Sequence, residues 1–174
     1  MKRTNHDRLI REVRPDETDV MYEIINDAAV AYRGVIPKDR YHEPYMPMKE
    51  LASEMEDGVH FTGCEVDGEL VGVMGVQDRG DVTLIRHAYV RTVLRGGGIG
   101  SLLLTTLLDE IDMPVLIGTW ADADWAIRFY EKHGFEVVTP EEKERLLRTY
   151  WRIPDRQVET SVVLADRTWL EQNR

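Results

Sequence analysis

The 174-residue chain has a single cysteine, Cys64, and no long apolar run. One cysteine cannot build an internal disulfide framework, which excludes the small secreted domains that depend on one. Cys64 lies in a strand-like segment, where a small core residue is favoured over a nucleophile. No window approaches the roughly 18 apolar residues of a transmembrane helix, and residues 1–8 are polar, unlike a signal peptide. We therefore expect a cytoplasmic protein.

Positive charge is also scarce, because 22 Lys and Arg residues face 32 Asp and Glu residues, for a formal net charge of −10. Binding to nucleic acid or to an anionic membrane needs a basic face, so we expect neither partner. The acidic balance fits an amine substrate weakly, and a solvated acidic surface is the favoured interpretation. The chain suits one domain large enough to bury a core, and we expect no metal site.

A glycine-rich segment, Arg-Gly-Gly-Gly-Ile-Gly, occupies residues 95–100. It follows an apolar, strand-like run at residues 82–90 and opens onto apolar residues at helical spacing. A turn of this kind leaves backbone N–H groups unpaired at the positive end of a helix, where they favour a phosphate. Glycines allow close approach, and Arg95 adds a positive charge. The alternative is a tight connection whose glycines serve only the backbone.

Two better-known phosphate loops do not fit this spacing. A Walker loop needs Lys before Ser or Thr, but Gly100 directly precedes Ser101 and the loop has no lysine. A dinucleotide-binding fingerprint would be poorly matched at Ser101, and no acidic residue closes a second strand about 20 residues later.

Hydrophobic periodicity and turn residues predict one α/β domain over residues 1–174, without repeats or a linker. Residues 32–47 form a long irregular segment of the kind that often acts as a lid. We expect strands at residues 9–13, 59–66, 70–77, 82–90, 115–120, 135–138 and 157–165. We expect helices at about residues 16–29, 47–57, 99–111, 125–133 and 140–150.

Residues 129–135 carry a second motif, an aromatic-Tyr-Glu-Lys run followed by Gly-Phe. In the first motif, Arg95, Gly98 and Gly100 match the pattern Arg or Gln, any two residues, Gly, any residue, then Gly or Ala. Together with the strand at 86–90, the two motifs resemble the GNAT superfamily of acyl-CoA-dependent N-acyltransferases, over about residues 8–165. The resemblance implies a single domain with a mixed, mostly antiparallel sheet of six to seven strands. It also implies that the fourth and fifth strands splay apart and that helices cover both faces.

The resemblance implies an N-acetyltransferase that uses acetyl-CoA as co-substrate and a primary amine of a small molecule, amino acid or peptide as acceptor. The amine would attack directly in a ternary complex. Tyr130 would act as the acid toward the CoA thiolate, and its alternative role is core packing with Phe129. The implied CoA-binding residues are Ala88, Tyr89 and Val90 along the pantetheine, then Arg95, Gly96, Gly97, Gly98, Ile99, Gly100 and Ser101 at the pyrophosphate.

The sequence motifs do not identify the general base. Some relatives carry an acid or histidine on the fourth strand, but the positions that match the acids hold Leu84 and Arg86. His87 is the only imidazole on this strand and is a candidate base, although strand alternation turns it away from Arg86 and a structural histidine is favoured. A water chain could also act, and the other candidates are Asp122, Asp124, Glu43 and His42.

Aromatic residues are the candidates for the acceptor pocket. Trp120 stands where many relatives have an asparagine that reaches the pantetheine, which leaves the acyl group open with acetyl as the default. Packing in the core is an equal alternative for Trp120. Trp151 and Tyr32 could instead mark a protein interface, such as that of a homodimer, if they are exposed. The pocket candidates are Tyr32, Arg86, Trp120 and Trp151. A second function also stays open, a catalytically inactive acyl-CoA-binding sensor or interaction module.

Overall fold

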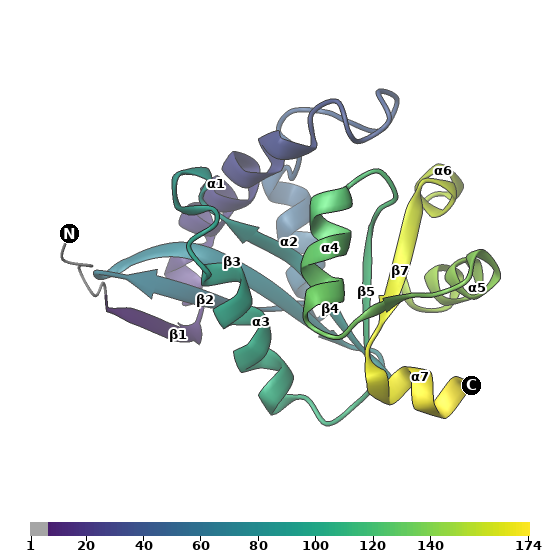
Figure 1. Ribbon diagram of the computed structural model, residues 1–174. Helices are drawn as coiled ribbons and strands as arrows, with labels where there is room; N and C mark the ends of the chain where they lie inside the picture. Colours follow the sequence, from purple (N-terminus) through teal and green to yellow (C-terminus); the bar gives the residue numbers. More distant parts are fainter. Residues whose placement is uncertain (1–6) are drawn as a thin grey trace. The chain divides into compact units, whose positions relative to one another are not determined.

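The computed structural model describes residues 7–174, and residues 1–6 of the polar N-terminal stretch lie outside the described residues. The strands form a seven-stranded sheet in the order β1-β2-β3-β4-β5-β7-β6. They are β1 (Arg8–Glu12), β2 (His60–Val66), β3 (Glu69–Asp78), β4 (Thr83–Val90), β5 (Val115–Trp120), β6 (Glu136–Val137) and β7 (Ser161–Ala165). The helices are α1 (Thr18–Ala29), α2 (Met48–Glu56), α3 (Ile99–Glu110), α4 (Asp124–Lys132), α5 (Pro140–Tyr150), α6 (Asp155–Glu159) and α7 (Arg167–Asn173) (Figure 1).

Contacts divide the chain into two compact units. Unit 1 extends up to residue 30 and includes residues 44–76 and 87–110, which carry β1, β2 and helices α1 to α3. Unit 2 comprises residues 31–43, 77–86 and 111–174, which carry β5 to β7 and helices α4 to α7. Strands β3 and β4 contribute residues to both units. No helix in residues 7–174 is long and apolar enough to cross a membrane.

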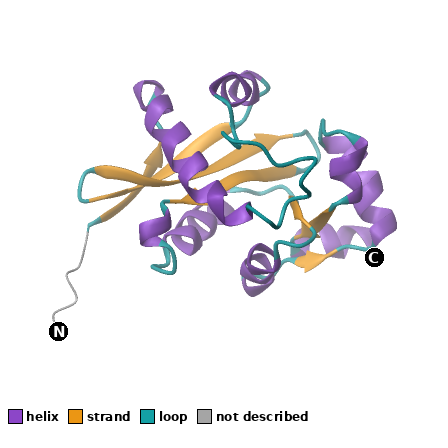
Figure 2. Ribbon diagram, turned by 90° about the horizontal axis from the view of Figure 1, so that it is seen from above, coloured by secondary structure: helices purple, strands orange, loops and turns teal. Residues whose placement is uncertain are grey.

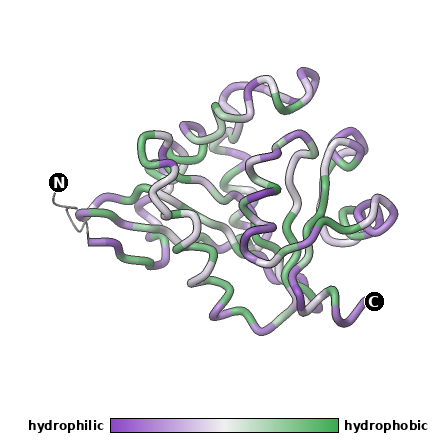
Figure 3. Tube along the Cα trace, in the orientation of Figure 1, coloured by the Kyte–Doolittle hydropathy of each residue, from purple (hydrophilic) through white to green (hydrophobic). Residues whose placement is uncertain are grey.

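Helices cover both faces of the strands in unit 1 (Figure 2). On one face, α1 and α2 share a core cluster with Val73 of β3, and its other members include Met21, Ile24, Ile25, Leu51 and Phe61. Gly72 points to the opposite face, because neighbouring strand residues alternate. A Cβ at Gly72 would lie 3.1 Å from Ile99 and 3.3 Å from Leu103, so α3 packs closely there. Figure 3 shows the hydrophobic residues of β3 and α3 in green.

The sheet is mixed, as predicted. Antiparallel pairs join β1 to β2, β2 to β3, β5 to β7 and β6 to β7, while β4 and β5 are parallel. The parallel pairing runs from Thr83 and Val115 to Ile85 and Ile117, and the later residues of both strands lie outside it. The α/β fold with a mixed sheet and helices on both faces is therefore confirmed. The splaying of the two strands beyond Ile85 stays a prediction.

The core of unit 2 gathers residues from β4, β5, β7 and three helices. Leu84 and Leu116 are fully buried in it. The other members are Val82, Leu146, Leu147, Trp151, Val158, Val163, Ala165 and Trp169. These apolar runs explain why strands that lie between helices read as continuously hydrophobic.

The C-terminal part differs from the expected strand at 157–165. Residues 155–159 form α6, and only Ser161–Ala165 are strand. Pro154 occupies the N-cap position and Asp155 lies in the first turn, which are helix-start signals that the β-branched run obscured. Helix α7 was not predicted, although the Asp166 side chain caps it by accepting a hydrogen bond from the Trp169 N–H at 2.9 Å.

We expect Gly72→Ala to lower the free energy of unfolding by about 1–2 kcal/mol. Overpacking costs roughly 1–3 kcal/mol, and the lost freedom of the unfolded chain offsets about 0.4–1 kcal/mol of it. Urea denaturation would measure the difference. The matched surface change Val93→Ala, at a side chain that is 88% exposed, should stay within about 0.5 kcal/mol of wild type. A Gly72→Ala protein as stable as wild type would contradict the close packing of α3.

Candidate functional site

The turn between β4 and α3 adopts the backbone that its glycines predict. The Arg91 N–H donates to the Val71 carbonyl at 2.9 Å, where β4 ends. Gly96 and Gly98 then have φ values of +77° and +83°, a region that favours glycine over residues with a Cβ. Arg95 and the glycines at 96–98 are exposed, so the turn is open to a ligand.

Backbone donors gather at the start of α3. The Leu102 N–H donates to the Gly98 carbonyl at 3.0 Å, so the N–H groups of Ile99, Gly100 and Ser101 precede the helical hydrogen bonds. The first N–H groups of a helix have no intrahelical acceptor, and the helix dipole adds a partial positive charge there. An anion such as a phosphate satisfies both features. The predicted phosphate-binding turn thus has the backbone that it needs.

Two acidic residues of α1 contact the start of the turn. Asp27 accepts a hydrogen bond from the Thr92 N–H at 2.8 Å, and its carbonyl accepts one from the Thr92 hydroxyl at 3.3 Å. The guanidinium of Arg91 lies 3.7 Å from Glu23. These contacts anchor the start of the turn and leave the glycine-rich residues 95–98 exposed.

The structure brings a second arginine to the turn, which the sequence analysis missed. An ideal Cβ at Gly97 would lie 3.7 Å from Nη2 of Arg8, and one at Gly98 would lie 3.7 Å from Nη1. Arg8 begins β1, far from the turn in the chain, and no local pattern connects the two.

His87 has an unusual backbone and a charged neighbour within unit 1. Its φ is +53°, which is uncommon for a residue with a Cβ and interrupts the regular alternation of β4. Nε2 lies 3.3 Å from Oε2 of Glu54 on α2, without the alignment of a hydrogen bond. The ring also lies 6.1 Å from that of Phe61 on β2. The side chain therefore faces α2 and β2.

The remaining predicted residues of β4 are partly buried. Ala88, Tyr89 and Val90 are intermediate in exposure, and the ring of Tyr89 lies 6.4 Å from that of Tyr45. Arg86 belongs to unit 2, where its Nη1 donates to Oε1 of the buried Gln77 at 3.1 Å.

Tyr130 is buried on α4 in unit 2, with 7% of its surface exposed. Its ring packs against Phe129 at 5.1 Å and Phe135 at 6.1 Å. Burial raises the pKa of its phenol well above the usual range, and Tyr32 raises that pKa further. The ring therefore packs in the core while the phenol stays protonated, so the packing role and the proposed acid role are compatible.

The aromatic pocket candidates lie in different surroundings within unit 2. Tyr32 is partly exposed, and its ring lies 5.2 Å from that of Trp125 on α4. Trp151 is a core residue that covers Gly118 of β5, where a Cβ would lie 3.3 Å from its ring. Trp120 is 7% exposed. Roles of these residues at an acceptor stay predictions.

Cys64 is fully buried, and burial raises the pKa of its thiol. A nucleophilic or redox role needs an exposed, easily ionised thiol. The interpretation of Cys64 as a core residue is therefore confirmed. Within residues 7–174, no group of three or more His, Cys, Asp or Glu side chains is arranged to hold a metal ion.

Stability at alkaline pH tests the environment of Tyr130. Its raised pKa means that the folded protein keeps the phenol proton after the unfolded chain has lost it, at about pH 10. Stability then falls as pH rises, by up to about 1.4 kcal/mol per pH unit, and is unaffected at lower pH. Between pH 9 and 11, wild type should lose about 1.4 kcal/mol more than Tyr130→Phe in urea denaturation. An identical pH dependence in both proteins would contradict the buried phenol.

Solved structures of other proteins have a similar fold. Among solved structures, the PaiA N-acetyltransferase from Thermoplasma acidophilum in complex with coenzyme A is 14% identical, over 92% of this chain and 98% of that chain, with a TM-score of 0.68. The ribosomal-protein-S18-alanine N-acetyltransferase from Escherichia coli is 17% identical over 92% and 93%, with a TM-score of 0.65. The ribosomal-protein-alanine N-acetyltransferase from Brucella melitensis is 24% identical over 75% and 86%, with a TM-score of 0.58.

These similarities support the fold, because the identities are low. The family is shown by a sequence match. Residues 22–150 match the family model described as Acetyltransferase (GNAT) domain, which is well over half of the chain. The protein therefore belongs to the GNAT acetyltransferase family.

Proposed function

We propose that the protein transfers an acetyl group from acetyl-CoA to a primary amine of a small molecule, amino acid or peptide. The observation that carries the proposal is the turn between β4 and α3, in a chain of the GNAT family. Its backbone donors and Arg95 suit a pyrophosphate, which acetyl-CoA carries. Residues 1–174 would act as one catalytic domain in the cytoplasm, and the reaction would not need a homodimer.

The acyl donor would bind along the end of β4. The backbone of Ala88 to Val90 would pair with the pantetheine amides as an added strand does. Arg95 and the backbone from Gly96 to Ser101 would hold the pyrophosphate. This mode uses backbone groups for most contacts, so it depends on the turn more than on particular side chains.

The reaction is a direct acyl transfer. The lone pair of a neutral amine attacks the thioester carbonyl carbon, and a backbone N–H near Ala88–Val90 stabilises the oxyanion. The C–S bond then breaks as the amide forms, and the amine nitrogen gives its proton to a base. Tyr130 donates a hydrogen bond to the departing CoA thiolate. The raised pKa makes this phenol a weaker acid, so its role would be a hydrogen bond to the thiolate rather than full transfer of the proton.

We propose His87 as the base, with Glu54 holding its ring. The 3.3 Å approach of the carboxylate to Nε2 favours the tautomer that carries a proton there and leaves Nδ1 able to accept one. The strained φ of His87 also fits a site residue, because such backbones persist where a function requires them. Glu43 is less suited, because Arg33 and Tyr41 hydrogen-bond it and lower its pKa. Asp122, Asp124, His42 and a water chain remain the alternatives.

The acceptor would contact Tyr32, Arg86, Trp120 or Trp151. Tyr32 supports the proposal most directly, since its ring lies 5.2 Å from that of Trp125 on α4, the helix that also carries Tyr130. An apolar, aromatic wall with few polar groups is typical of small-molecule sites.

The second candidate function is an acyl-CoA-binding sensor without catalysis. The observation that favours the sensor is that Leu84 and Arg86 occupy the two positions where some relatives carry an acid. Leu84 is fully buried in the core of unit 2, and Arg86 is hydrogen-bonded to Gln77. A thiol-release assay with acetyl-CoA over a panel of amino acids, peptides and small amines separates the two functions. Release that depends on an amine supports the enzyme, and CoA binding without release on any amine supports the sensor.

With an accepted amine, Tyr130→Phe should lower kcat about 10- to 100-fold and change KM for acetyl-CoA little. The lost hydrogen bond forms only as the thiolate departs, so it affects the transition state. The matched control is Tyr150→Phe, which removes a hydroxyl that bonds to Asp81 on the surface. Equal kcat values for Tyr130→Phe and wild type would remove Tyr130 from the chemistry.

His87→Asn should lower kcat/KM about 100-fold at pH 7, and Glu54→Gln should have a smaller effect of the same sign. Asparagine tolerates positive φ, so this change removes the imidazole and keeps the backbone. The exposed His60 supplies the control, His60→Asn. Steady-state kinetics would measure all three. Wild-type kcat/KM in His87→Asn would assign proton removal to another residue or to water.

A further inference from the structure

We propose that Arg8 of β1 is a phosphate-binding residue of the CoA site. It would contact a phosphate at the 3′-phosphoadenosine diphosphate end of the acyl donor. This inference rests on the proposed function, because it assumes that the turn between β4 and α3 holds CoA. It adds a specificity determinant from β1, which is distant in sequence from the turn.

The backbone of Arg8 is held firmly at its place in the sheet. Arg8 pairs with Val66 of β2, and the Asp67 N–H donates to the Asp7 carbonyl at 3.2 Å. Pairing of β2 with β3 and of Arg91 with Val71 then brings the end of β4 to the same side of unit 1. The start of β1 therefore meets the turn by sheet register.

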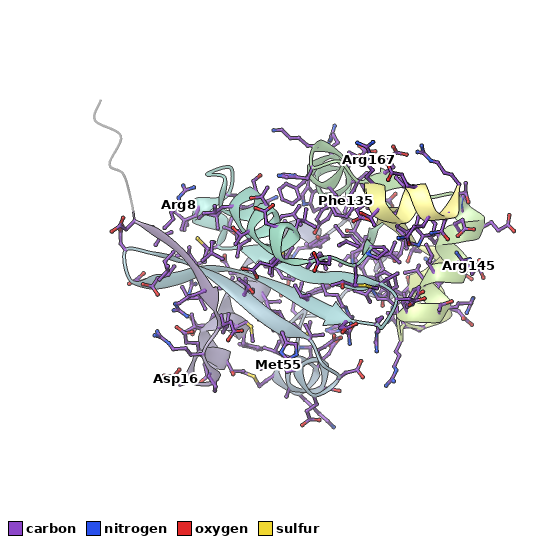
Figure 4. All side chains as sticks on the ribbon, turned by 90° about the horizontal axis from the view of Figure 1, so that it is seen from below. Arg8, Asp16, Met55, Phe135, Arg145 and Arg167 are labelled. Atoms are coloured by element: carbon purple, nitrogen blue, oxygen red, sulfur yellow. The ribbon has the colours of Figure 1, made fainter. Side chains whose placement is uncertain are left out.

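The guanidinium of Arg8 lies across two glycines of the turn. Its Nη2 and Nη1 atoms would each be 3.7 Å from a Cβ at Gly97 and Gly98, which is van der Waals distance. The guanidinium therefore lies beside the segment that leads directly into the N–H groups of α3. Figure 4, in which Arg8 is labelled, shows its side chain at this end of unit 1.

Arg8 differs from the next arginine of the same strand. Arg11 is bound by two carboxylates, with Nε 2.7 Å from Glu65 and Nη2 2.7 Å from Glu17. Among residues 7–174, no carboxylate forms an ion pair with Arg8, and its side chain is exposed. Arg11 thus has a structural role, and Arg8 has donors available for a ligand.

Charge makes such a residue useful. The chain has a formal net charge of −10, which on average repels a polyanion such as CoA. Arg91 beside this turn is already within 3.7 Å of Glu23. Arg95 and Arg8 are therefore the local cations that offset the repulsion, and a guanidinium can donate two hydrogen bonds to one phosphate.

Calorimetric titration of the full chain with CoA and with dephospho-CoA, which lacks the 3′-phosphate, tests the inference. We expect Arg8→Ala to weaken CoA binding about three- to thirtyfold, and added salt to reduce the difference. A loss with CoA alone assigns Arg8 to the 3′-phosphate, while an equal loss with both ligands assigns it to the pyrophosphate. Unchanged affinity for both ligands overturns the inference.

Two control variants complete the experiment. Arg14→Ala removes another exposed arginine near the N-terminus, one that pairs with Glu17, and should bind CoA like wild type. Arg95→Ala should weaken the binding of both CoA and dephospho-CoA. Thermal unfolding of each variant separates lost binding from lost fold. Failure of wild type to bind CoA rejects the proposed function and this inference together, whereas normal binding by wild type and Arg8→Ala rejects the inference alone.

Discussion

The backbone of β4 imposes the constraint on which the rest of the site depends. Its first residues pair in parallel with β5 as far as Ile85, and His87 then takes a left-handed backbone. At its end, the Arg91 N–H bonds to Val71 and starts the turn into α3. This strand therefore contains a buried parallel pairing and a strained residue, and it leads into the turn before the N–H donors of α3. Changes in its register would displace all three.

The turn also provides local positive potential in an acidic protein. If it binds CoA as proposed, a chain with a net charge of −10 does so through local features, because its average potential opposes the approach of a polyanion. Backbone N–H groups and a helix dipole supply positive potential that does not appear in the count of charged side chains. An acidic residue of α1 contributes as well, since the Asp27 carboxylate positions the start of the turn by accepting a hydrogen bond from the Thr92 N–H.

Local signals predicted those elements whose physics is local. The Thr139 side chain caps α5 by accepting from the Glu142 N–H at 3.2 Å, as the capping-box pattern indicates. Asp67 and Gly68 both have positive φ in the hairpin between β2 and β3, and Gly134 has φ +88° after α4. The strand predicted at residues 157–165 was wrong at its start. Val158 of α6 has strand propensity, but its burial in the core as part of a helix outweighs that propensity.

The sequence by itself determined the family, the fold class and the backbone of the glycine-rich turn between β4 and α3. These follow from spacing within short segments, such as residues 95–100, where glycine permits a backbone that other residues resist. Tertiary structure alone decided which distant side chains meet. It brought Glu54 to His87, Tyr32 to Trp125 and Arg8 to Gly97. The physical reason is that strand register and helix packing bring such residues together. The local sequence around Arg8 predicts neither of them.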